Sequence, residues 1–250
     1  MPKQIRLGIL TPSSNTSLEP LTQSIISALP NVTVHFSRFP VTKISLDADA
    51  LSQFQTENIL VAAQLLADAN VDIIGWSGTS SGWLGFEADE ALCAAISEAT
   101  GVPATTSVLA LNKACKVLGV QRLGLVTPYV DNVQDAIVRT YAGVGIEVTE
   151  EKHLGMSKNT AFAEVEERVL DEMVAHVVKR SQREEGKGES VQAVTTFCTN
   201  LRAAQRVDFW EKEHGVPVFD TVATVVWDML RYCKVDMAPL RDWGVLFTKE

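Results

Sequence analysis

The sequence has few cysteines and no long apolar run, and each absence excludes a class of protein. Its four cysteines are widely separated, without the paired spacing of a zinc site or the density of a disulfide framework. No apolar run approaches the roughly 18 residues that a membrane span requires. The first residues lead directly into a strand-like segment, without a secretion signal. We therefore expect a cytoplasmic protein with no membrane partner.

Positive charge is also scarce. The chain carries 22 lysines and arginines against 31 aspartates and glutamates, a net charge of −9, which argues against a nucleic-acid partner. The glycine-rich motifs that bind dinucleotides or phosphates are absent, and the four histidines show no metal-ligand spacing. We expect neither a cofactor nor a metal.

What the sequence does contain is an internal repeat. Its 250 residues, 46% of them hydrophobic, suffice for one large α/β unit or two small lobes. Three segments recur in the same order, 114 to 120 residues apart: 6–12 at 122–128, 71–79 at 191–199, and Gly-Val-Pro 101–103 at 215–217. Matching order and a nearly constant separation indicate two similar lobes.

Each lobe alternates strand-like and helix-like segments. Continuous apolar runs at 7–10 and 123–126 are typical of parallel strands that are buried on both faces. Helical spacing of apolar residues predicts helices at 56–69, 88–100, 160–179 and 221–232. Such alternation predicts an α/β fold with a parallel sheet flanked by helices in each lobe.

The repeat also predicts the limits of the lobes. Residues 1–115 form the first lobe and 116–217 the second, with 218–250 expected to cross back to the first. The charged stretch 181–190 is typical of a solvated loop.

Four expected strand ends carry small polar side chains, at 11–16, 77–81, 127–129 and 198–200. Ligands of parallel sheets bind beyond the carboxyl ends of strands, near the free N–H groups of helix starts. If a pseudo-two-fold axis relates the lobes, all four loops line one cleft of neutral donors, which suits a small carboxylate. A single loop of this kind is more typical of helix capping than of ligand binding, but four matched loops favour a binding site.

Cys198 differs from the other three cysteines, which are typical of small core residues. It ends an apolar run and begins a polar turn that is expected to open a helix. A helix N-terminus lowers the pKa of a thiol and favours reactivity. Trp76 and Trp83 lie close enough to the second loop to contact a ligand.

The motifs in these loops, together with Gly-Met-Ser-Lys-Asn at 155–159 and Cys-Thr-Asn-Leu-Arg at 198–202, extend over nearly the whole chain. In them the chain resembles the aspartate/glutamate racemase superfamily, in the branch of maleate cis–trans isomerases and arylmalonate decarboxylases. The resemblance implies two Rossmann-like lobes, an active site between them, and cofactor-independent chemistry at a carbon adjacent to a carboxylate.

Racemases and maleate isomerases of this superfamily use two cysteines, one from each lobe. By resemblance Cys198 matches the second cysteine, and Gly78 stands at the position of the first. Arylmalonate decarboxylases likewise have Gly-Thr-Ser there and keep only the second cysteine. The resemblance implies that the substrate is held by Pro12, Ser13, Asn15, Gly78, Thr79, Ser80, Tyr129, Asn159, Thr199 and Asn200.

The missing cysteine decides which reaction we expect. Racemisation needs two groups that exchange protons on opposite faces of a carbon, and maleate isomerisation needs a thiolate that adds to the double bond. Decarboxylation needs an enediolate-stabilising site and one proton donor. The chain is therefore expected to decarboxylate a small dicarboxylic acid with Cys198 as proton donor.

Two other hypotheses about the function remain at this point. Thr199 and Asn200 follow the cysteine where arylmalonate decarboxylases have glycine, and the polar first loop is closer to that of isomerases. One alternative is a maleate or Asp/Glu-type isomerase in which Ser77, Thr79 or Ser80 replaces the first cysteine. Another is a non-catalytic dicarboxylate-binding relative. In each case we expect a homo-oligomer.

Overall fold

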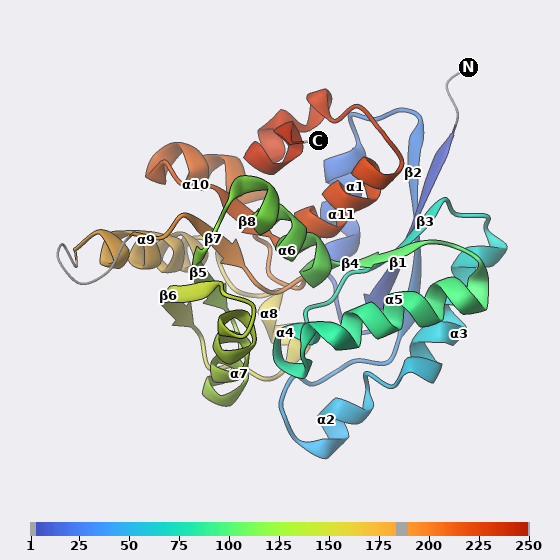
Figure 1. Ribbon diagram of the computed structural model, residues 1–250, viewed down its shortest axis with the longest axis horizontal. Helices are drawn as coiled ribbons and strands as arrows, with labels where there is room; N and C mark the ends of the chain where they lie inside the picture. Colours follow the sequence, from blue (N-terminus) through green and yellow to red (C-terminus); the bar gives the residue numbers. More distant parts are fainter. Residues whose placement is uncertain (1–3, 184–189, 250) are drawn as a thin grey trace.

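Two four-stranded parallel sheets form the framework of the computed structural model, which describes residues 4–183 and 190–249 (Figure 1). The strand orders are β2-β1-β3-β4 and β6-β5-β7-β8. The first lobe comprises β1 (Ile5–Pro12), α1 (Leu18–Ile26), β2 (Val32–Phe39), α2 (Ala48–Ser52), α3 (Thr56–Asp68), β3 (Ile73–Trp76), α4 (Ser81–Leu84), α5 (Phe86–Thr100), β4 (Ala104–Thr106) and α6 (Ser107–Leu118).

The second sheet has the same strand order, with every strand number raised by four. Its part of the molecule comprises β5 (Arg122–Thr127), α7 (Asp131–Ala142), β6 (Glu147–His153), α8 (Asn159–Phe162), α9 (Glu167–Arg183), β7 (Ala193–Thr196), η1 (Ala204–Arg206), α10 (Val207–His214), β8 (Val218–Asp220), α11 (Thr221–Tyr232), η2 (Ala238–Trp243) and η3 (Val245–Thr248). The three recurring segments contain or precede the equivalent strands β1 and β5, β3 and β7, and β4 and β8, so the predicted two-lobed α/β fold is confirmed.

The inner strands are apolar because helices cover both faces of each sheet. Leu7, Ile9 and Leu10 of β1 and Leu123 and Leu125 of β5 are fully buried. A parallel strand in this position has no solvent-facing side, so its sequence does not alternate between polar and apolar residues.

Helix α11 packs closely on the first sheet, although the strand before it belongs to the second. A Cβ atom added to Gly75 of β3 would lie 2.5 Å from Sδ of Met229, so only glycine permits this approach. Ser107 Oγ donates to the Thr221 carbonyl at 2.6 Å, and Thr224 Oγ1 donates back to the Ser107 carbonyl at 2.9 Å. The residue limits of the two lobes stay a prediction.

The predicted helices agree with the structure except at 160–179. There the chain forms α8 and then α9, and residues 163–166 separate them. Tertiary bonds fix the start of α8, because Asn159 donates from its N–H to the Thr42 carbonyl at 3.3 Å and from Nδ2 to Ser14 Oγ at 2.7 Å. A single helix was therefore the wrong prediction.

The charged stretch 181–190 differs from its prediction at its start. Residues 181–183 continue α9 rather than begin a loop, whereas 184–189 lie outside the described residues. Among the residues that the structure describes, no helix combines the length and apolarity needed to cross a bilayer.

Candidate active site

The carboxyl ends of β1, β3, β5 and β7 meet at a small cavity between the lobes. Its volume is about 20 Å³, enough for about one water molecule. Eight of the predicted site residues line it: Pro12, Gly78, Thr79, Ser80, Tyr129, Asn159, Cys198 and Thr199. The other five lining residues are apolar: Val41, Ile44, Phe54, Trp76 and Trp83. The lining therefore contains no charged side chain.

Cys198 lies at the second-lobe side of the cavity, with 2% of its surface exposed. Burial raises the pKa of its thiol to about 11, although the Tyr129 hydroxyl and the backbone N–H groups of Asn200 and Leu201 act in the opposite direction. The expected helix does not begin here, since residues 199–202 form a turn and the next helical residues start at Ala204. The expectation of a lowered thiol pKa is therefore wrong, and the thiol is protonated at neutral pH.

Hydroxyl groups connect Cys198 to the first lobe. The Tyr129 hydroxyl lies 2.7 Å from Thr79 Oγ1 and also interacts with the Cys198 thiol. Burial raises the pKa of Tyr129 well above its ordinary value, so the phenol stays neutral. Together with Ser80 these groups form a set of neutral donors, the kind of site that stabilises a developing negative charge without a fixed cation.

Two asparagines that we expected to hold substrate do not line the cavity but connect the lobes. Asn15 Oδ1 accepts from the N–H groups of Ser17 and Leu18, both at 2.9 Å, and its Nδ2 donates to Thr199 Oγ1 at 3.2 Å. Asn200 Oδ1 accepts from the N–H groups of Thr16 and Ser17, at 3.0 and 3.2 Å, and its Nδ2 donates to the Asn159 carbonyl at 2.7 Å. Their contact with substrate stays a prediction.

Ser13 is the third predicted residue outside the cavity. It is exposed, and its Oγ accepts from the Val41 N–H at 3.1 Å. Ser14 Oγ donates to the Val41 carbonyl. The first loop therefore holds in place the segment that covers the cavity.

That covering segment supplies the residues that the sequence did not identify. Val41, Ile44 and Phe54 lie between β2 and α3 and turn apolar side chains to the cavity. The second lobe fixes the segment, because the Ile44 N–H donates to the Ser157 carbonyl at 3.0 Å. No polar motif marks these three residues.

The two tryptophans line the cavity, as expected from their positions. Trp83 makes edge contacts with Phe54 and Tyr129, at centroid distances of 6.1 and 5.4 Å. Its Nε1–H is buried and has no hydrogen-bond acceptor among the described residues. The site thus contains one buried donor that remains available to a bound molecule.

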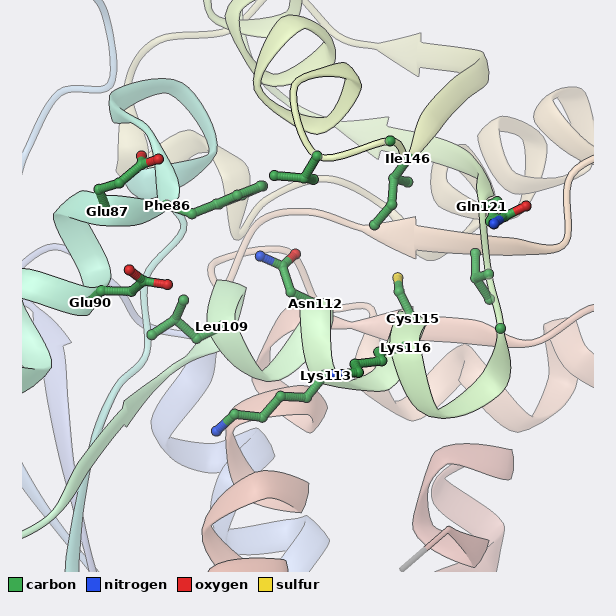
Figure 2. A pocket seen from close by; sticks show the side chains of 14 residues that line it. Phe86, Glu87, Glu90, Leu109, Asn112, Lys113, Cys115, Lys116, Gln121 and Ile146 are labelled. Carbon is green, nitrogen blue, oxygen red and sulfur yellow. The ribbon is translucent and has the colours of Figure 1, made fainter.

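A larger cavity lies elsewhere and contains none of the predicted site residues. Side chains of α5, α6 and the turn before β6 surround about 890 Å³ (Figure 2). Its lining includes Glu87, Lys116 and the buried Cys115, and burial raises the pKa of the Cys115 thiol to about 12. Within residues 4–183 and 190–249, no cluster of acidic, histidine or cysteine side chains has the composition of a metal site.

Known proteins share both this sequence pattern and this fold. The sequence model of the arylmalonate decarboxylase family matches residues 26–244. The arylmalonate decarboxylase of Bordetella bronchiseptica is 27% identical over 192 residues, which are 76% of this chain and 77% of that protein. The resemblance inferred from the motifs is thereby confirmed.

Solved structures of both branches superpose on the chain. The maleate isomerase of Pseudomonas putida S16, solved with maleate as a cysteine-to-alanine variant, gives a TM-score of 0.87 at 22% identity over 98% of each chain. A crystal structure of arylmalonate decarboxylase gives 0.74 at 20% identity, covering 98% of this chain and 100% of that one. At 20–22% sequence identity, this structural similarity shows that the chain shares its fold with both enzymes.

Proposed function

The chain belongs to the arylmalonate decarboxylase family, and from this we propose that it decarboxylates a small malonate-type dicarboxylic acid without a cofactor. Cys198 is the single catalytic cysteine and donates the proton that replaces the lost carboxylate. One observation carries the proposal: the cavity is lined by the buried thiol of Cys198 and by Gly78, which by resemblance stands at the position of the first cysteine.

A dicarboxylic acid is larger than the cavity of about 20 Å³, so the walls must move apart to admit it. The two kinds of cavity wall would then give the two carboxylates of the substrate different environments. One carboxylate accepts hydrogen bonds from Thr79, Ser80 and Tyr129. The other faces Val41, Ile44 and Phe54, whose side chains offer no donor to compensate the loss of water, so its charged form is destabilised.

The bond between the α-carbon and the second carboxylate then breaks, and carbon dioxide leaves. The electron pair of that bond delocalises into the retained carboxylate as an enediolate, which the neutral donors stabilise. The Cys198 thiol transfers its proton to the α-carbon. The resulting thiolate faces the N–H groups of Asn200 and Leu201 and regains a proton from water.

The protonation state of Cys198 argues against the addition of a thiolate to a double bond. With a pKa of about 11, about one thiol in ten thousand is ionised at pH 7. The same property suits a general acid, which must carry its proton when the carbanion forms.

A second candidate is isomerisation of maleate or a related unsaturated dicarboxylate. The higher TM-score to maleate isomerase and the Thr199–Asn200 pair after the cysteine favour it. In that reaction Cys198 is the nucleophile, and another group protonates the adduct. A non-catalytic dicarboxylate-binding protein is the third possibility.

Proton NMR in D₂O separates these functions. The purified chain is incubated in parallel with 2-methyl-2-phenylmalonate and with maleate. We expect the malonate to yield 2-phenylpropionate with one deuteron at the α-carbon, and maleate to remain unchanged. Cys198→Ala abolishes turnover, whereas Cys115→Ala, which removes a buried cysteine outside the cavity, retains it.

The other outcomes identify the competing functions. Fumarate formed from maleate by the wild-type chain would contradict decarboxylation as the main activity. Saturable binding of either acid without conversion would identify the non-catalytic relative.

A further inference from the structure

We infer that Trp76 is a specificity-determining residue, because its indole ring fills the volume that a side chain at position 78 would occupy. A Cβ atom added to Gly78 would lie 2.0 Å from Cζ2 of Trp76, 2.3 Å from Cε2 and 2.6 Å from Cη2. Ordinary contacts between carbon atoms are about 3.5–4.0 Å. A thiol at position 78 therefore requires the ring to move.

The ring has little freedom to move. Trp76 ends β3, where it is paired with Leu10 of β1 and Thr106 of β4, and only 1% of its surface is exposed. Its ring contacts Phe39 at a centroid distance of 4.9 Å. Because interiors are close-packed, a buried ring held on several sides does not yield to an added group without disturbing its neighbours.

The second lobe shows the opposite arrangement at the equivalent positions. The strand pairing places Thr196 of β7 where β3 has Trp76, and Cys198 follows two residues later, as Gly78 does in the first lobe. The Thr196 hydroxyl is directed to Asp220, to which it donates at 2.8 Å. A small residue at the strand end thus accompanies the cysteine in one lobe, and a large residue accompanies glycine in the other.

This pairing gives Trp76 a role in choosing the reaction, an inference that rests on the proposed function. The indole replaces a thiol on the first-lobe side of the cavity. It presents an apolar surface in place of a second acid or base, and it prevents a cysteine at position 78 from restoring one. Reaction type is therefore set by the pair Trp76 and Gly78, and not by the glycine alone.

Stability measurements test the packing part without any assay of turnover. We compare Gly78→Ala with Gly143→Ala, a matched control whose added Cβ would meet only backbone oxygens at 3.3 and 3.6 Å. We expect Gly78→Ala to lower the thermal midpoint by several degrees and the control to leave it within about one degree. Trp76→Thr places the residue of the second lobe at this position. In the Trp76→Thr background, Gly78→Ala should lower the thermal midpoint much less than it does in the wild type. Equal midpoints for the two alanine variants would overturn the inference.

Activity measurements then test the reaction choice. The single variant Gly78→Cys and the double variants Trp76→Thr/Gly78→Cys and Trp76→Val/Gly78→Cys are incubated with enantiopure 2-phenylpropionate in D₂O. We expect the double variants to exchange the α-proton and racemise the acid at least tenfold faster than the single variant. Racemisation by Gly78→Cys alone at the rate of the double variants would refute a role for Trp76.

The outcomes of the two tests separate this inference from the proposed function. If the wild-type chain fails to decarboxylate malonates but the stability coupling between positions 76 and 78 is present, the proposed function is wrong and the packing relation stands. If decarboxylation is observed without that coupling, the inference about Trp76 is wrong.

Discussion

Alkylation of Cys198 distinguishes a proton donor from a nucleophile, and its rate follows from the burial of the thiol. The reactive species is the thiolate. An ordinary thiol with a pKa of 9.0 is about 1% ionised at pH 7, whereas burial raises the pKa of Cys198 to about 11 and leaves about 0.01% ionised. Ionisation alone therefore predicts alkylation about 100-fold slower than that of a free thiol, which corresponds to about 2.7 kcal/mol.

The assay follows iodoacetamide labelling of the native chain by peptide mass spectrometry, with N-acetylcysteine as the reference thiol. Cys115 is the internal control, because burial raises its pKa to about 12. We expect Cys198 to react at least 100-fold more slowly than the reference at pH 7, and about tenfold faster for each pH unit up to pH 10. Labelling as fast as the reference at pH 7 would show a thiolate at position 198, and the case for a protonated donor would fail.

Three further predictions concern the cavity and its support. Thr79→Val removes the 2.7 Å contact with Tyr129. We expect kcat for decarboxylation to fall about 100-fold and the free energy of unfolding to fall by about 1 kcal/mol. The control Thr79→Ser should retain most of the activity. Trp83→Phe removes a buried N–H without an acceptor among the described residues and leaves a small cavity, so calorimetry should show a stability loss of about 1 kcal/mol. Kinetics should show a raised KM, and an unchanged KM would mean that the N–H does not contact substrate. Burial raises the pKa of Asp220 from 3.8 to about 6, so the folded state binds this proton more tightly than the unfolded state does. Protonation of Asp220 therefore stabilises the fold, fully below pH 3.8, and this contribution is lost as the pH rises through 6. Relative to Asp220→Asn, the wild type should therefore lose about 2.4 kcal/mol of stability between pH 4 and pH 7, and parallel pH profiles of the two proteins would contradict this.

The two lobes and the place of the site could be predicted from the sequence. The recurring segments predicted equivalent strands, because residues at the same point of a repeated unit form the same local structure. Cys198, Thr79 and Tyr129 are predicted to meet because a pseudo-two-fold axis between the lobes brings the loops at the strand ends of both sheets to one cleft. The cavity lining includes all three.

The behaviour of those residues depends on contacts that the sequence does not reveal. The pKa of Cys198 depends on burial by segments distant in the chain, so the local pattern, which suggested a helix start and a lowered pKa, was misleading. Asn15 and Asn200 are polar in the sequence, but their partners across the lobes involve them in joining the two halves.

The wall of the cavity was equally invisible in the sequence. Val41 and Phe54 carry no motif and reach the site because hydrogen bonds to the opposite lobe fix the segment that contains them. The overlap between Trp76 and a side chain at position 78 exists only in three dimensions. Local patterns specify strands, helices and loop ends, whereas burial, close packing and contacts between lobes depend on residues that are far apart in the chain.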